Sequence, residues 1–369
     1  MTTTKNNEHK ELNVPNLRFP EFQGEWEKCK LSENCTFFSG GTPSSSNKDF
    51  YGGNIAFIRS GELHADSTEL FITQAGFDSS SAKMVEVGDL LLAMYGATSG
   101  DIAVSKIKGA INQAILCIRT KQNKKFIESV WNKHVSKNLR KYLQGGQGNL
   151  SADIVKGISF FFPTLKEQEK IANLVSLLDE RIATQNKIID KLQSLIKGIA
   201  QKIVRSNKPN VRLTECMECK SSTLQESEVC EQGTYPVYGA NGIVGYLDNY
   251  NTEGEAVYII KDGSGVGTVS YVTGKCSATG TLNTLQAKEG YSLQYLYYLL
   301  KVFNFEPYKT GMAIPHIYFK DYGKAKVFCP SYTEQLQYAR LLSAIDNKLS
   351  IEQNILTELT LQRGCVISL

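Results

Sequence analysis

Apolar residues recur with a regular spacing in two long stretches of the chain. In the first stretch the steps alternate between four and three residues, with Gln185 in one otherwise apolar slot, at Ile171, Val175, Leu178, Ile182, Ile189, Leu192, Ile196, Ile199 and Ile203. The second stretch has the same spacing, with Glu352 in the polar slot, at Tyr338, Leu342, Ile345, Leu349, Leu356 and Leu359. A repeat of about 3.5 residues is typical of a coiled-coil seam. The pattern predicts two long helices that pack on each other, the first over about residues 167–204.

The two stretches are parts of one internal repeat. The segments 162–168 (FPTLKEQ) and 329–335 (CPSYTEQ) lie 167 residues apart and share a proline, a hydroxyl residue and Glu-Gln. Both precede an apolar ladder, as expected of a helix start. The same offset places Glu352 on Gln185, so we predict that these residues are polar register positions, which lower stability but limit slippage. The alternative is two separate amphipathic helices, each packed on its own domain.

Each predicted helix follows a body of mixed pattern, in which short β-branched runs alternate with turns rich in Gly, Asn and Ser. We expect an α+β fold with a first body (residues 1–165), a first helix (166–206), a second body (207–331) and a second helix (332–369). The polar connector 205–210, which contains a proline, marks the boundary between the halves. The bodies differ in sequence while the frame repeats, which favours two binding domains with different targets on one scaffold. Strands are expected at 54–58, 89–94, 111–119, 255–260, 268–272 and 281–286.

Composition limits the class of protein. The 369 residues suffice for two domains, and 41% apolar and 21% charged residues are typical of a folded globular chain. No apolar run reaches the roughly 18 residues of a membrane span, and the N-terminus does not look like a signal peptide, so we expect a cytoplasmic location. Nine scattered cysteines favour reduced thiols. Cys216 and Cys219 form a lone CxxC without a second ligand pair, so we expect no metal.

A series of motifs spans nearly the whole chain. The motifs of the first half lie at 38–44 (FSGGTPS), 51–55 (YGGNI), 88–100 (GDLLLAMYGATSG), 111–114 (INQA) and 145–151 (GGQGNLS), and the second half contributes 233–243 (GTYPVYGANGI). Their joint order resembles the specificity subunit of a type I restriction–modification enzyme. Two features depart from that pattern: the second body has no counterpart to residues 22–26, and the second ladder ends after Leu361.

The resemblance implies an architecture and a role. Residues 1–165 and 207–331 would be two target-recognition domains, and the helices would pair as an antiparallel coiled-coil spacer. The chain would read an asymmetric bipartite target in double-stranded DNA and would itself catalyse nothing. Two modification subunits would methylate adenine with S-adenosylmethionine, and restriction subunits driven by ATP and Mg would cleave. No cofactor is expected in this subunit.

The residues themselves also argue against an enzyme. An adenine methyltransferase needs a Pro-Pro-aromatic loop and a translocase needs GxxxxGK[ST], and the sequence contains neither. The segment 262–267 (DGSGVG) looks like a cofactor loop, but strand-like residues follow it where a cofactor motif would open a helix. The alternative function is a non-catalytic protein-interaction scaffold. A steep salt dependence of DNA binding would distinguish a DNA reader from a scaffold.

Charge and hydrogen-bonding residues suggest DNA contacts. The net charge of +4 permits nucleic-acid binding without requiring it. A basic helix of the first body offers phosphate contacts at Lys124, Lys125, Lys133, Lys137, Arg140 and Lys141, and Lys309 lies in the corresponding region of the second. Base-edge contacts are expected from Arg59, Gln147 and Asn149 in the first body and from Asn241, Lys261 and His316 in the second. The glycine-rich loops around Gly146 and Ser264 would let backbone approach DNA. The alternatives are a solvated helix face and ordinary turn residues.

Overall fold

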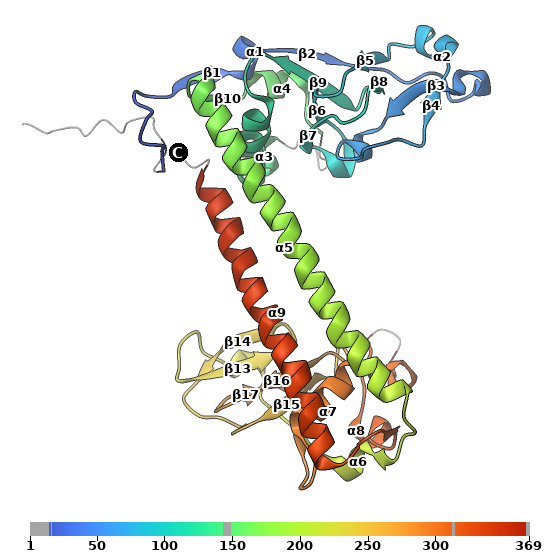
Figure 1. The fold of residues 1–369 in the computed structure, drawn as a ribbon, viewed down its shortest axis with the longest axis vertical. Helices are drawn as coiled ribbons and strands as arrows, with labels where there is room; N and C mark the ends of the chain where they lie inside the picture. Colours follow the sequence, from blue (N-terminus) through green and yellow to red (C-terminus); the bar gives the residue numbers. More distant parts are fainter. Residues whose placement is uncertain (1–14, 16, 143–148, 312–313, 367–369) are drawn as a thin grey trace, which may run out of the picture. The chain divides into compact units, whose positions relative to one another are not determined.

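The computed structural model describes residues 15, 17–142, 149–311 and 314–366, apart from the side chains of residues 136–142. The chain forms two compact units (Figure 1). Unit 1 comprises Met1–Thr184 and Leu356–Leu369, and unit 2 comprises Gln185–Ile355. Each unit contains one α+β body and a portion of both long helices, α5 (Leu165–Arg205) and α9 (Tyr332–Val366). Within the described part of the chain, no helix is long and apolar enough to cross a membrane.

The main sheet of unit 1 has four antiparallel strands in the order β2-β9-β6-β7. The strands are β2 (Cys35–Ser39), β6 (Leu90–Ala93), β7 (Ile102–Val104) and β9 (Ile115–Thr120), and helix α3 (Lys124–Tyr142) follows β9. Successive residues of a strand face opposite sides of a sheet. Leu90 and Leu92 pack in one core with Trp131 of α3, whereas Leu91 and Ala93 pack in a second core. Because both faces are covered, the whole strand is apolar.

The rest of the first body surrounds this sheet. A second sheet has the order β4-β3-β8-β5, and the pair β1–β10 precedes α5 in the chain. These elements and the short helices are β1 (Glu27–Lys30), α1 (Leu31–Asn34), β3 (Tyr51–Ile58), β4 (Phe71–Ile72), α2 (Gln74–Asp78), β5 (Lys83–Val85), β8 (Gly109–Ile111), α4 (Ala152–Gly157) and β10 (Ser159–Phe162). The single strand expected at 111–119 is wrong, because a turn separates β8 from β9. In this turn Ala114 N donates to Asn112 Oδ1 at 3.0 Å.

Unit 2 has the same main sheet as unit 1. Its strand order is β12-β18-β15-β16, again antiparallel, and a smaller sheet has the order β14-β13-β17. The elements are β11 (Val211–Arg212), α6 (Leu213–Cys216), β12 (Met217–Ser221), β13 (Tyr235–Gly239), β14 (Gly242–Leu247), β15 (Ala256–Ile260), β16 (Val269–Val272), β17 (Ser277–Ala278), β18 (Leu282–Ala287), α7 (Leu293–Lys301), α8 (Phe319–Tyr322) and β19 (Lys326–Val327).

The two bodies therefore share one fold although their sequences differ. Ala93 N donates to Asp101 O at 2.8 Å, and the residues 167 positions later, Ile260 N and Thr268 O, form the same bond at 3.0 Å. The parallel pair β3–β8 likewise matches the parallel pair β13–β17. The difference lies between the first two strands of the main sheet, where unit 1 has the longer segment 40–89 and unit 2 the shorter segment 222–255. The common fold rests on backbone hydrogen bonds, which leave side-chain identity free to diverge.

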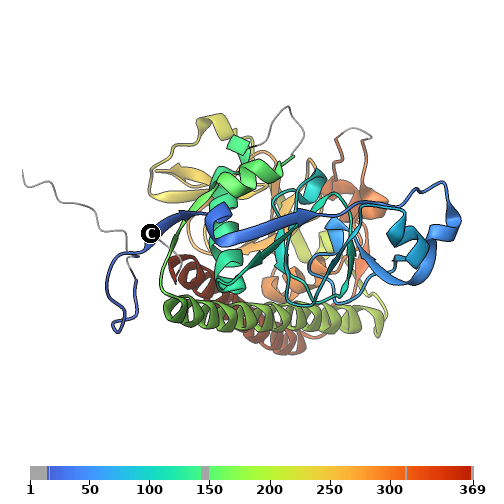
Figure 2. The same cartoon turned by 90° about the horizontal axis from the view of Figure 1, so that it is seen from above.

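The paired helices are confirmed, and they run antiparallel. Within unit 1 Arg363 of α9 bonds to Asp179 of α5, and within unit 2 Gln185 of α5 bonds to Glu352 of α9. The later residue of α9 pairs with the earlier residue of α5, so the two helices are antiparallel. The two helices lie side by side in Figure 1 and in Figure 2. All expected seam residues are buried or half-buried: Ile171, Val175, Leu178, Ile182, Gln185, Ile189 and Leu192 on α5, and Tyr338, Leu342, Ile345, Leu349, Glu352, Leu356 and Leu359 on α9.

The second ladder does not end at Leu361. Helix α9 continues to Val366, which is 7% exposed and belongs to the core of unit 1. The steps from Leu359 to Arg363 and from Arg363 to Val366 are four and three residues, so both residues fall on the heptad. Arg363 occupies a seam position and forms an ion pair with Asp179. Because a charged residue interrupts the apolar spacing there, the sequence pattern does not show that the repeat continues.

Candidate nucleic-acid interface

Several chain segments of unit 1 meet at one edge of its two sheets. Strands β3 and β8 are parallel with Ile58 opposite Ile111, so the residues that follow them, from Arg59 and from Asn112, emerge at the same edge. Next along this edge, Met94 N donates to Ala114 O at 2.8 Å. The segment after α3 comes next, because Leu150 N donates to Met94 O at 2.8 Å. The exposed side chains carried by these segments are Arg59, Gln113, Tyr95 and Asn149, which we call the first row.

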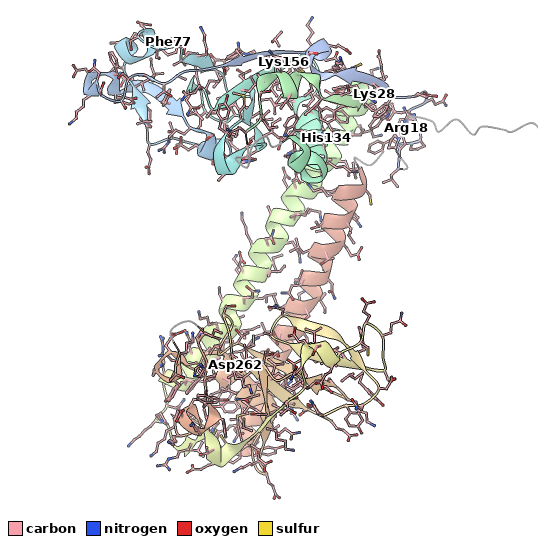
Figure 3. The ribbon with its side chains drawn as sticks, turned by 180° about the vertical axis from the view of Figure 1, so that it is seen from behind. Arg18, Lys28, Phe77, His134, Lys156 and Asp262 are labelled. Atoms are coloured by element: carbon pink, nitrogen blue, oxygen red, sulfur yellow. The ribbon has the colours of Figure 1, made fainter. Side chains whose placement is uncertain are left out.

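Unit 2 builds an equivalent edge. Strands β13 and β17 are parallel with Tyr238 opposite Ala278, and Asn241 lies in the turn that follows β13. Lys261 N donates to Thr281 O at 3.0 Å, and Ile317 N donates to Lys261 O at 2.9 Å. These bonds match those of Met94, Ala114 and Leu150 at the offset of 167 residues. We call Asn241, Lys261, Ser264 and His316 the second row. Asp262, which follows Lys261 in the chain and marks the place of this row, is labelled in Figure 3.

The turns at the centre of both rows require glycine. Gly96 and Gly263, at equivalent positions, have φ of 75° and 95°. A side chain is strained at such angles, so glycine lets the two turns adopt the same path. The two edges therefore share one backbone and differ in their side chains. Arginine at a base edge favours guanine, and asparagine favours adenine, so different side chains on one backbone would read different bases.

The structure reveals a polar pair beside the first row that sequence reasoning missed. His64 Nε2 lies 2.9 and 3.1 Å from the two carboxylate oxygens of Asp101, the residue that closes the β6–β7 turn. Both side chains are more than one-third exposed. Arg59 Nη2 also has a partner, Glu62 Oε1, at 2.6 Å, and its hydrogen bond lowers the pKa of Glu62. No sequence signal connects His64 with Asp101, because only the folding of two sheets brings them together.

The basic residues proposed as phosphate contacts have partners within the fold. Lys124 donates to Gly88 O and lies 3.9 Å from Asp89, at the start of β6, whereas the first row lies at its end. The other pairs are Lys125 with Glu128 and Asp179, Lys133 with Gly364 O, and Lys309 with Glu306. Phosphate contact by these lysines stays a prediction. The side chains of Lys137, Arg140 and Lys141, and all of Gly146 and Gln147, lie outside the described residues.

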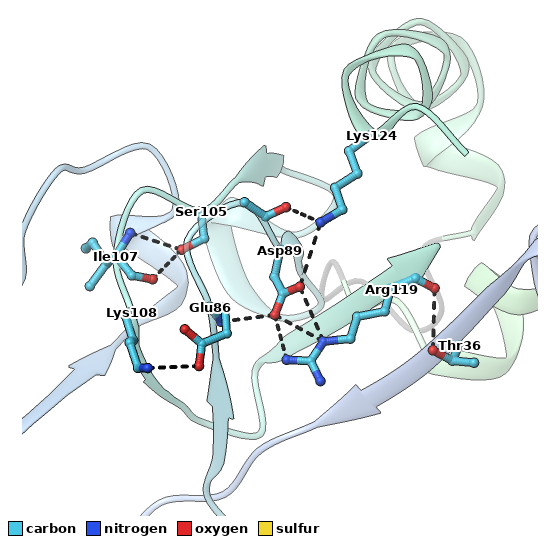
Figure 4. A network of polar contacts seen from close by, with 9 residues as sticks. Thr36, Glu86, Asp89, Ser105, Ile107, Lys108, Arg119 and Lys124 are labelled. Carbon is cyan, nitrogen blue, oxygen red and sulfur yellow. Dashed lines mark hydrogen bonds and ion pairs between the residues drawn. The ribbon is translucent and has the colours of Figure 1, made fainter. Parts of the chain in front are cut away.

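An ion pair between the exposed Arg119 and the buried Asp89 anchors the end of the main sheet far from the first row. Arg119 of β9 donates to Asp89, just before β6, from Nη2 at 2.7 Å and from Nε at 3.1 Å (Figure 4). The backbone N of Glu86 donates to the same carboxylate at 3.0 Å. Burial acts to raise the pKa of Asp89, but these hydrogen bonds and the nearby charges outweigh it and lower the pKa. The network holds β6 and β9 in register, and thereby the loops at their other ends.

A second candidate surface lies on the long helices in unit 2. Five large aliphatic side chains are 37–53% exposed there: Ile188, Leu195, Leu341, Ile351 and Ile355. Ile188 and Leu195 are seven residues apart and so share a face of α5 away from the buried seam residues. Ile355 is the repeat equivalent of Ile188. Apolar side chains gathered on an exposed helix face are typical of protein-docking surfaces.

Comparison with known proteins agrees with this geometry. A curated relative from Methanocaldococcus jannaschii, a putative type I restriction enzyme specificity subunit, is 24% identical over 94% of this chain and 92% of its own length. The specificity subunit of the Escherichia coli type I restriction enzyme EcoprrI is 28% identical, but the match covers 31% of this chain and only 29% of that relative. The solved structure of a type I restriction–modification S subunit from M. genitalium has the same fold, with a TM-score of 0.67 over 96% of this chain and 98% of that chain at 18% identity.

The repeat also appears in a family model. The model described as the type I restriction modification DNA specificity domain matches twice, over residues 23–194 and 206–361. Each match contains one body and the larger part of the long helix that follows it. The chain therefore belongs to the type I restriction–modification DNA specificity family and carries two copies of its domain.

Proposed function

We propose that this chain reads a bipartite DNA sequence, one half with the first row and the other half with the second. The observation that carries the proposal is the equivalence of the rows: the Leu150–Met94 and Ile317–Lys261 bonds build the same edge in both units. Loops on a rigid sheet edge suit side chains that must meet base edges reproducibly. A repeated edge favours two separate contacts with DNA over one continuous contact.

The DNA target is proposed to be asymmetric. The first row presents Arg59, Tyr95 and Asn149, whereas the second presents Asn241, Lys261 and His316. Equivalent backbone with different donors and acceptors selects different bases. The segments 40–89 and 222–255 also differ in length, so each unit surrounds its row differently.

Catalysis is assigned to partner subunits. The matched relatives are named specificity subunits of restriction enzymes, and this sequence lacks the Pro-Pro loop of an adenine methyltransferase. We propose that two modification subunits, which would bind S-adenosylmethionine, dock on the exposed apolar side chains of α5 and α9. Restriction subunits would supply the steps that need ATP and Mg. The paired helices would act as the spacer between the two readers.

The experiment is a binding selection on the full chain in complex with its modification subunits. Duplexes enriched from a random pool should share one motif of two unlike halves separated by an unread gap. Affinity for that motif should fall steeply with salt, because phosphate contacts release counterions. A protein-interaction scaffold would enrich no motif and show no salt dependence, and either result would overturn the proposal.

A further inference from the structure

Ile314 stands out in the second row. It is 66% exposed, the largest fraction of any large hydrophobic side chain among the described residues. It lies two residues before His316 in the segment that joins the second row. Apolar surface in water is unfavourable, so such a side chain suggests a ligand that covers it.

Backbone hydrogen bonds hold described residues that lie before and after Ile314 in the chain. Thr310 and His316 exchange two backbone hydrogen bonds at 2.9 and 2.8 Å, and Gly263 N donates to Pro315 O at 2.9 Å. His316 Nδ1 lies 3.2 Å from Ile314 O. Gly311 has a φ of 88°, and a side chain there would meet Ile314 O at 2.3 Å, so glycine permits the close approach. Pro315 and His316, the two residues that follow Ile314, are thus held in place by backbone hydrogen bonds.

The repeat shows what Ile314 replaces. The offset of 167 residues that aligns Leu150 with Ile317 places Ile314 on Gln147 in the sequence. Glutamine can hydrogen-bond to adenine, whereas isoleucine can make only apolar contacts. The C5-methyl group of thymine is the apolar feature that the major groove offers. A change from amide to aliphatic side chain at one position of the sequence repeat fits a change in the base that is read.

The surroundings of Ile314 suit DNA better than a protein. Ile317 N donates a hydrogen bond to the backbone O of Lys261, which belongs to the second row. Lys320 lies over the ring of Tyr318, with its Nζ 5.1 Å from the ring centroid. Lysines in the segments around Ile314 match a groove, where phosphates flank the base edges. A protein-docking surface would present a wider apolar patch.

We propose that Ile314 contacts the C5-methyl group of a pyrimidine, namely thymine, in the half-site read by unit 2. The inference rests on the proposed function and deepens it, since it assigns one residue to one chemical group of the target. The first half-site, with Gln147 at the equivalent position, would have no such contact.

The test replaces thymines of the selected motif with deoxyuridine, which removes only the methyl group. Binding of the full chain with its modification subunits is measured for each substituted duplex. One position in the second half-site should weaken binding about fourfold, the effect of one buried methyl-sized group. Ile314→Ala should bind the thymine and deoxyuridine duplexes equally, whereas Ile314→Val should keep part of the difference.

Ile243→Ala is the matched control, because Ile243 is another exposed isoleucine of unit 2, 53% exposed on β14, and its loss should leave the deoxyuridine effect unchanged. A duplex with 5-methylcytosine at the sensitive position should bind better than one with cytosine if the methyl group itself is read. A second half-site without thymine on either strand, or a deoxyuridine effect that persists in Ile314→Ala, would overturn the inference alone. Failure to obtain any motif would instead overturn the proposed function.

Discussion

Gln185 and Glu352 occupy the same slot of the two heptad ladders and hydrogen-bond to each other. Gln185 Nε2 donates to the backbone O of Glu352 at 2.9 Å and also to its carboxylate. Both side chains are buried, and Lys348 forms an ion pair with Glu352. In an antiparallel pair, equivalent positions can meet only at the centre of the repeat. The contact therefore sets the register of α5 on α9.

Replacing both Gln185 and Glu352 with leucine should raise the melting temperature. The double change exchanges buried polar groups for seam packing, and a gain of about 1 kcal/mol corresponds to roughly 2–4 °C. Glu352→Leu alone should lower the melting temperature, because it leaves the Gln185 amide without its carboxylate partner. Thermal unfolding followed by circular dichroism compares the variants. A double variant less stable than the wild type would show that these residues stabilise the seam.

Arg18→Ala should destabilise unit 1. Glu167 is 1% exposed and accepts hydrogen bonds from Arg18 Nε and Nη2, both at 2.8 Å, and from Trp26 Nε1 at 3.2 Å. Arg18 is marked in Figure 3. Its loss leaves a buried carboxylate with one donor, at a cost of about 1–3 kcal/mol. Faster proteolytic cleavage near Trp26 in Arg18→Ala than in the wild type would show that unit 1 is destabilised. Lys170→Ala, which breaks an exposed ion pair with Glu21, is the control and should change little.

Acid should destabilise unit 1 through Asp89. The folded pKa of Asp89 lies below the ordinary 3.8, so its ion pair with Arg119 contributes stability at pH values above that figure. This contribution is lost as the pH falls below about 4 and through the folded pKa. Asp89→Asn should reduce the free energy of unfolding at neutral pH. It should also make the free energy of unfolding fall less between pH 7 and pH 3 than it does in the wild type. Urea unfolding at pH 7 and pH 3 measures both, and an unchanged difference between the two pH values would count against this role.

Charge on the exposed helix face should block partner binding without unfolding the chain. Ile355→Glu places a carboxylate on an exposed position of α9, so the melting temperature should hold while co-purification with the modification subunits falls at least tenfold. Leu349→Glu is the matched seam change and should lower the melting temperature, because Leu349 is buried. Normal co-purification of Ile355→Glu would remove this face from the proposed interface.

Sequence periodicity predicted the helix pair well, because a heptad depends on which residues are apolar. It failed at Arg363, where an ion pair occupies a seam position. Periodicity alone does not show the common fold of the two bodies. That fold is held by backbone bonds such as the one from Leu150 N to Met94 O, whose equivalent joins Ile317 and Lys261 although the side chains differ.

The candidate site was predicted as residue types but not as an arrangement. Arg59 and Asn149 were selected singly, and only the parallel pairing of β3 with β8 and the bond from Leu150 brings them to one edge. His64 was missed, because a lone histidine has no sequence link to Asp101. A run of basic residues in the sequence also does not distinguish lysines that contact phosphate from lysines that pair with carboxylates of the protein. Lys124 and Lys125 have buried or half-buried carboxylate neighbours, which the sequence pattern could not show.

The central claim is that each row reads one half of the target. The direct measurement is the DNA motif selected by the wild type, by Asn149→Ala and by His316→Ala, each in complex with the modification subunits. The account predicts that Asn149→Ala relaxes only the first half-site and His316→Ala only the second, with the gap between the halves unchanged. Relaxation of both halves by either single change would contradict it.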